Sequence, residues 1–153
     1  MTASNHFITG ATIGAAIANP WVAIPLAVAS HFVLDAGPQY GYDDEREDKR
    51  LGLSLFQWVL ALDIMMFAIL IWMLTFVIDR PELVFFGLAG YSPDLMWIHR
   101  FFVTEKVAKN LRPKMNRLQK FHASVQKLES PKFLPFEVGY FIALAYGLII
   151  LSA

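Results

Sequence analysis

The chain has 153 residues, of which 56% are hydrophobic and 17% are charged, and its net charge is zero. This balance gives no reason to expect nucleic-acid binding, and the absence of cysteine excludes disulfides and thiolate metal ligands. The length favours one domain over residues 1–153, in which any metal site has to use nitrogen and oxygen donors.

Long apolar blocks predict an all-α integral membrane bundle of about five helices. The expected helices cover about residues 6–18, 21–36, 54–78, 82–103 and 136–152. The third runs 25 positions with a single charge, which exceeds the roughly 20 residues needed to cross the hydrocarbon. No Lys or Arg precedes the first apolar stretch, so we expect the amino end to be retained rather than cleaved as a signal peptide.

The first two apolar segments are short for spanning helices, at about 20 to 24 Å. Asn19 and Pro20 separate them, so we expect a hairpin of short helices that turns there, with a re-entrant pair as the alternative. Gly10 and Gly14 have the GxxxG spacing, which favours close packing of the first helix against a neighbour.

Lys and Arg concentrate in residues 37–53 and 100–132. If all five helices cross, both segments lie on one side, and the positive-inside rule makes that side, with the amino terminus, cytoplasmic. We therefore expect a multi-pass protein of the cell membrane. An amphipathic helix at the interface is expected over about 111–129, because apolar positions recur there at steps of three and four. These positions are Leu111, Met115, Leu118, His122 and Val125.

Several ionisable residues fall at a similar depth in the expected helices. Each lies 11 to 15 residues from the outer end of its own helix, which is about 17 to 23 Å. A charged group in hydrocarbon costs several kcal/mol unless it is paired or faces the bundle interior, so we expect one shared site. The residues are His6, His31, Asp35, Asp63, Asp94 and Glu137.

Local spacing brings some of these residues closer together. His31 and Asp35 are four residues apart, so they share one face of a helix, and the hairpin would bring His6 opposite them. Ser92 and Pro93 are typical of a helix start, so they predict a break in the fourth helix beside Asp94. Broken helices at membrane depth occur where the backbone lines a cavity or is buried in protein.

Neutral imidazoles with carboxylates suit Zn²⁺ or another borderline divalent metal, which makes a bound water nucleophilic when one position stays open. The expected ligands are His6, His31, Asp35 and Asp94, with His122 as a further ligand or a partner of one. We expect Asp63 and Glu137 to orient ligands or to act as general base. Simpler alternatives are a hydrogen-bonded His31 and Asp35 pair, helix pairing for Asp63 and a helix-start carboxylate for Glu137.

Four stretches carry a family resemblance, in the order "NHFITGATIG", "LAVASHFVLDAGPQYGY", "YSPDLMW" and "KFHASVQKLE". With them the chain resembles small prokaryotic membrane proteins related to the membrane-bound metal-dependent hydrolase-like family, distant kin of zinc phospholipases C. The resemblance covers most of the chain outside the third and fifth helices. It implies a fixed set of metal ligands. They are His6, His31, Asp35, Asp94 and His122.

One position departs from that family pattern. Such relatives tend to show a histidine after "LDAGP", where this chain has Gln39. Glutamine is a poor zinc ligand, so the departure argues against a second metal and leaves the chemistry open.

The sequence leaves two main hypotheses for the function, from different classes. The first is a membrane-embedded, zinc-dependent hydrolase that acts on a phosphoester or lipid-like substrate near the cytoplasmic leaflet. The alternative is a non-catalytic structural or accessory subunit of a larger membrane complex, whose buried polar residues serve helix packing. Membrane lipids are the expected partners, together with other subunits or further copies of the chain. A transporter is a weaker third alternative.

Overall fold

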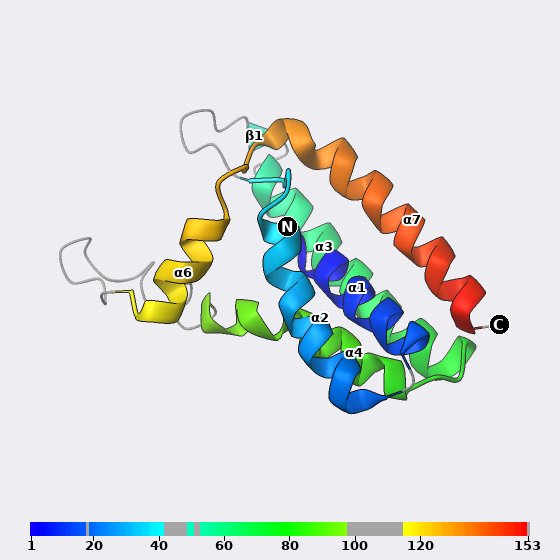
Figure 1. Ribbon diagram of the computed structural model, residues 1–153. Helices are drawn as coiled ribbons and strands as arrows, with labels where there is room; N and C mark the ends of the chain where they lie inside the picture. The colour runs from blue at the N-terminus through cyan, green and yellow to red at the C-terminus, as the bar shows by residue number, and fades with distance from the viewer. Residues whose placement is uncertain (18, 42–48, 51–52, 98–114, 153) are drawn as a thin grey trace.

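In the part of the chain that the computed structural model describes, the regular elements are helices, apart from one ladder of two-residue strands (Figure 1). The described residues are 1–17, 19–41, 49–50, 53–97 and 115–152. The strands β1 (Lys49–Arg50) and β2 (Leu53–Ser54) pair antiparallel. The helices are α1 (Ala3–Ala16), α2 (Pro20–Asp35), α3 (Leu55–Trp72), α4 (Glu82–Tyr91), α6 (Arg117–Val125) and α7 (Leu134–Ser152). The prediction of an all-α fold is therefore confirmed for the described residues.

Helix α1 is the centre of the bundle, and α2, α3, α4 and α7 all pack against it (Figure 1). Every residue from Ser4 to Ala11 is buried, so this helix presents no solvent-facing side over two turns. Apolar side chains of α1, of the α3 segment with the turn that ends it, of α4 and of α7 form the core. They are Phe7, Ile8, Ala11, Leu70, Leu74, Leu83 and Leu148.

A short turn joins α1 to α2, as the sequence predicts. The Asn19 side chain accepts a hydrogen bond from the Trp21 backbone N–H, and Pro20 is the first helical residue. Both are usual features of a helix start, where the first backbone N–H groups have no partner within the helix. The cap binds one of these groups, and proline has no N–H to leave unpaired. The two helices lie side by side, so residues near the start of α1 meet residues near the end of α2.

Helices α1 and α4 approach each other at backbone distance. A Cβ atom on Gly10 would lie 2.3 Å from the Phe86 carbonyl oxygen, and one on Gly90 would lie 2.5 Å from the His6 carbonyl oxygen. Only glycine fits at either position, so the close packing expected of Gly10 is present. The contact fixes the backbone of Gly90 beside α1.

The expected fourth helix is interrupted where the sequence predicts a break. Helix α4 ends at Tyr91, and the 3₁₀ turn η2 (Ser92–Asp94) follows. The Ser92 hydroxyl donates to the Ala89 carbonyl at 2.8 Å instead of capping the next segment. This break places Asp94 directly after α4, close to the end of α2. The remainder of the expected helix beyond residue 97 lies outside the described residues.

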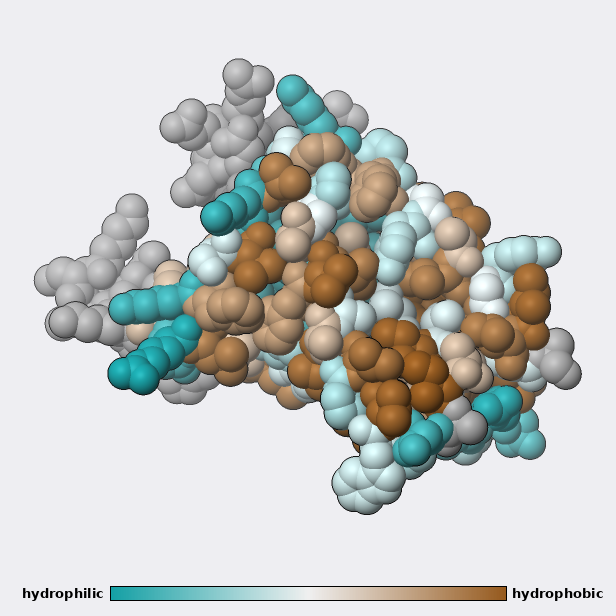
Figure 2. All heavy atoms as spheres, viewed as in Figure 1, coloured by the Kyte–Doolittle hydropathy of each residue, from teal (hydrophilic) through white to brown (hydrophobic). Residues whose placement is uncertain are grey.

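Two helical segments are long and apolar enough to cross a membrane, by length and composition. They are Gln57–Val77, which ends in the π-helical turn η1 (Met73–Val77), and Pro131–Ser152, which begins with the 3₁₀ turn η4 (Pro131–Phe133). Most of their surface faces outward. Figure 2 shows hydrophobic residues spread over the visible face of the molecule.

Helix α6 is shorter than the amphipathic helix expected over 111–129. It begins at Arg117 with a capping box, in which Asn116 and Gln119 each bond the other's backbone N–H. Of the expected apolar stripe, His122 is fully buried, whereas Leu118 is 53% exposed. Leu111 lies outside the described residues. Helix α6 thus buries one histidine against α2, while most of its other side chains remain exposed.

Candidate metal centre

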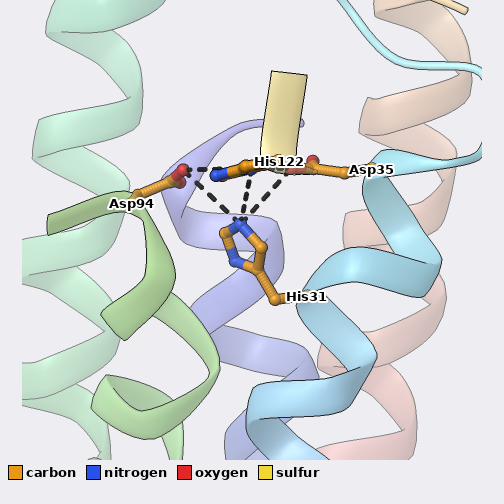
Figure 3. A group of neighbouring side chains, drawn as sticks. All are labelled: His31, Asp35, Asp94 and His122. Atoms are coloured by element: carbon orange, nitrogen blue, oxygen red, sulfur yellow. Dashed lines mark hydrogen bonds and ion pairs between the residues drawn. The ribbon is translucent and has the colours of Figure 1, made fainter. Parts of the chain in front are cut away.

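Four side chains from three parts of the fold meet at one end of the bundle (Figure 3). His31 and Asp35 come from the last turns of α2, Asp94 from the turn after α4, and His122 from α6. One nitrogen or oxygen from each lies within 4.8 Å of the others. The structure therefore brings together four of the five residues predicted as metal ligands.

The spacing of these atoms resembles that of ligands around one ion. His31 Nε2 lies 3.2 Å from His122 Nε2, 3.3 Å from Asp35 Oδ2 and 3.5 Å from Asp94 Oδ1. Donors arranged tetrahedrally around zinc are about 3.4 Å apart. One pair is closer than this: His122 Nε2 and Asp35 Oδ2 are hydrogen-bonded at 2.5 Å. Two imidazoles and two carboxylates also suit a divalent cation chemically.

The backbone orients His31 for such a role. Its Nδ1 lies 3.0 Å from the Gly90 carbonyl oxygen, which can only accept a hydrogen bond. The proton of the neutral ring is therefore on Nδ1, and the Nε2 lone pair points at the other three residues. Close glycine packing between α1 and α4 holds the Gly90 carbonyl in place.

Asp35 is the centre of the hydrogen-bond network and has no exposed surface. Oδ2 accepts from His122 and, at 3.0 Å, from the Gln126 side-chain amide. Oδ1 accepts from the Met1 amino group at 3.1 Å and lies 3.1 Å from His6 Nε2. Protein groups thus surround both oxygens.

His6 lies beside the group without belonging to it. Its ring stacks on His31 with centroids 3.8 Å apart and is 1% exposed. Among the described residues, neither ring nitrogen has a hydrogen-bond partner, because the approach to Asp35 is not aligned for one. A buried imidazole without partners next to four potential ligands is consistent with a cation at this place.

Gln39, at the position where the sequence departs from the expected pattern, is fully buried and links two loops. Its side-chain amide donates to the Asp35 carbonyl at 3.1 Å and to Glu129 Oε1 at 3.3 Å, and its Oε1 accepts from the Met1 amino group. Its backbone bonds both Leu128 and Ser130. These contacts hold the segment after α6 against the end of α2.

Asp63 and Glu137 contact a different part of the chain. Asp63 accepts from the backbone N–H groups of Ala3 at 2.8 Å and Ser4 at 2.9 Å. Glu137 accepts from the backbone N–H groups of Thr2 at 2.9 Å and Tyr40 at 2.7 Å. Both carboxylates therefore hold the start of α1, and a catalytic role for either stays a prediction.

The charge of Glu137 also changes the pKa of Tyr40, which lies close to it in the fold. Burial and the nearby Glu137 charge raise the pKa of the Tyr40 phenol, so this hydroxyl stays neutral.

Two residues that bond members of the histidine and aspartate cluster were not predicted from the sequence. Gln126 lies four residues after His122 and bonds Asp35, a contact that helical spacing could have indicated. Trp97 donates its indole N–H to His122 Nδ1 at 3.0 Å. Nothing in the spacing of Trp97 signals this bond, because it joins segments 25 positions apart.

Comparison of the chain with family models, with curated proteins and with solved structures gives no match. The family resemblance therefore stays a prediction, and the geometry of the site is the basis for the function proposed below.

Proposed function

We propose that the protein is a membrane-embedded, metal-dependent hydrolase that acts on a phosphoester or lipid-like substrate near the cytoplasmic leaflet. The observation that carries this proposal is the convergence of His31, Asp35, Asp94 and His122 within 4.8 Å. A bound divalent cation such as zinc would supply a Lewis acid that polarises the phosphoryl group and makes water a better nucleophile.

The burial of the group indicates how substrate would reach it. The side chains of His31, Asp35 and His122 have no exposed surface, whereas that of Asp94 is 23% exposed. A substrate phosphate would therefore approach past Asp94. The three buried side chains would exclude bulk water from the far side of the cation, which strengthens its interactions with charged groups.

The membrane arrangement is part of the proposal. We infer that all five apolar segments cross, with the amino terminus in the cytoplasm. The outward apolar faces of the two longest segments support this arrangement. If all five segments cross, three parts of the chain should lie on one side of the membrane: the α1 to α2 turn, the α3 to α4 turn and the carboxyl terminus. In Figure 1 all three lie toward the same end of the bundle.

Single-cysteine labelling tests the orientation, because the native chain contains no cysteine. We expect Arg80→Cys to react with a membrane-impermeant maleimide in intact cells. Lys127→Cys should react only after the cells are opened. Reaction of both variants from the same side would contradict the proposed crossing pattern.

A second candidate function is a non-catalytic subunit of a membrane complex. The observation that favours it is that Asp35 already accepts hydrogen bonds from Met1, His122 and Gln126. A buried carboxylate satisfied in this way needs no cation, and the group would then serve packing alone. The apolar outer faces would contact partner helices instead of lipid.

Asp94→Asn separates the two functions. Asp94 is partly exposed, so we expect the free energy of unfolding to change by less than about 1 kcal/mol. Removing one ligand charge should lower the affinity for zinc or manganese at least tenfold and reduce hydrolysis of a phosphodiester in parallel. The measurements are metal analysis of the purified protein and phosphate release, in nanodiscs.

Glu82→Gln is the matched control, since it neutralises an exposed carboxylate that pairs with Arg80. It should leave metal content and hydrolysis unchanged. Native protein that binds no divalent metal would exclude the hydrolase and favour the accessory subunit. Metal binding without any phosphoester cleavage would also overturn the proposed reaction.

A further inference from the structure

The two histidines of the group are hydrogen-bonded in opposite ways. His31 Nδ1 faces a carbonyl oxygen, that of Gly90, at 3.0 Å. His122 Nδ1 faces the indole N–H of Trp97, also at 3.0 Å. A carbonyl accepts hydrogen bonds, whereas an indole N–H only donates them. The same ring atom therefore needs a proton in one residue and a lone pair in the other.

The tautomer of each neutral ring follows from this difference. His31 carries its proton on Nδ1, which leaves Nε2 free to bind a cation. His122 accepts at Nδ1, so its proton is on Nε2. A histidine that binds metal through Nε2 normally donates its Nδ1–H to an acceptor. In His122 that proton would point at the N–H of Trp97, and two donors would face each other.

The other contacts of His122 agree with a proton on Nε2. This atom lies 2.5 Å from Asp35 Oδ2, and because an ionised carboxylate oxygen can only accept a hydrogen bond, the proton between them belongs to Nε2. The ring is fully buried, with Phe32 edge-on at a centroid distance of 5.5 Å and Trp97 at 5.7 Å. Turning the ring over would place carbon atoms against both Trp97 and Asp35, with loss of both hydrogen bonds.

We infer that His122 is not a metal ligand but a hydrogen-bond donor that positions Asp35, and that Trp97 is the positioning residue that fixes its tautomer. The inference rests on the proposed function, because it assigns roles within the same site. His31, Asp35 and Asp94 then remain as the ligands. Three protein ligands with an open position are typical of catalytic zinc sites, whereas four protein ligands are typical of structural ones.

Nuclear magnetic resonance of the native protein tests the assignment directly. The chain has four histidines, so ¹⁵N labelling of histidine gives few signals, which single His→Gln variants assign. In mild detergent, long-range ¹H–¹⁵N spectra should show His31 protonated on Nδ1 and His122 protonated on Nε2. After addition of ¹¹³Cd²⁺, coupling should appear at His31 Nε2 and not at His122.

Trp97→Phe tests the positioning role, because phenylalanine keeps a ring but has no N–H. We expect His122 to lose its pure Nε2–H pattern, while His31 keeps its own. Trp21→Phe is the matched control, since Trp21 is 87% exposed and the same substitution there removes no contact to a histidine. If Trp97→Phe does not fold, the spectra of the native protein still decide the ligand question.

Each outcome bears on one of the two proposals. Cadmium coupling to His122 Nε2, or a proton on His122 Nδ1, would overturn the inference and leave the metal-dependent hydrolase standing. Protein that binds no metal but keeps the His122 proton on Nε2 would refute the hydrolase and retain the hydrogen-bond assignment. An unchanged His122 pattern in Trp97→Phe would overturn the role of Trp97 alone.

Discussion

Two pairs of carboxylates in this bundle differ in what they bond. Asp63 and Glu137 accept hydrogen bonds from backbone N–H groups at the start of α1 and near Tyr40. Asp35 and Asp94 lie against imidazole rings. A backbone N–H is always a donor, so these contacts of the first pair are structural, and a catalytic role for either residue stays a prediction. An imidazole nitrogen can offer a lone pair or a proton, so the second pair lies where chemistry can occur.

The comparison shows that depth in the fold does not distinguish the two uses. All four acids lie at similar distances along apolar helices, and Asp35, Asp63 and Glu137 are all buried. The partner decides the role, and partners come from other helices. Variants that damage one pair of carboxylates and spare the other test this distinction.

Gly90→Ala is expected to have the largest effect, because it acts on the imidazole side through the backbone. The added Cβ would lie 2.5 Å from the His6 carbonyl oxygen, so α1 and α4 have to separate. We expect a loss of about 3 kcal/mol in the free energy of unfolding. Moving the Gly90 carbonyl would also release His31 Nδ1, so metal affinity should fall in the protein that still folds. Denaturant unfolding in mild detergent and metal analysis measure the two effects.

Gly139→Ala is the matched control for this substitution. Gly139 lies within α7 with nothing within 4 Å of its added Cβ. Because alanine has the higher helix propensity, we expect a gain of about 0.5 to 1 kcal/mol. Equal destabilisation by both substitutions would show that tight packing at Gly90 is not the cause.

Asp63→Asn is expected to have a smaller effect on stability than Gly90→Ala, and no effect on metal. The asparagine amide turns one acceptor into a donor, which leaves a backbone N–H of Ala3 or Ser4 without a partner. We expect a loss of about 2 kcal/mol, the cost of a buried donor left unpaired. Metal content per folded molecule should equal that of the native protein. A loss of metal or hydrolysis without loss of stability would instead support the catalytic role predicted from sequence.

Much of the fold could be predicted because its signals are local. Apolar blocks give α1, α2 and α7 to within a few residues, and Asn19 with Pro20 marks the turn. The interruption near Ser92 follows from the proline beside it. The pairing of His31 with Asp35 follows from helical spacing, and the structure places their side chains 3.3 Å apart.

The remainder depends on contacts between distant segments or with backbone atoms. The use of Asp63 and Glu137 as caps for α1 could not be seen, because their partners are backbone N–H groups with no sequence signature. The Gly90 carbonyl that orients His31 is invisible for the same reason. Trp97 is one of four tryptophans in the chain, and only its position across from His122 gives it a role.

The central position of α1 has a consequence for biosynthesis. Helices that follow α1 in the chain enclose it, and the bond from Thr2 to Glu137 spans 135 positions. The Thr2 backbone N–H therefore meets this partner only after the start of α7 has been made. Until such long-range contacts form, a partly folded chain exposes apolar surface, which favours aggregation. The contacts of Glu137 with the start of the chain can therefore form only after every member of the histidine and aspartate cluster has been made.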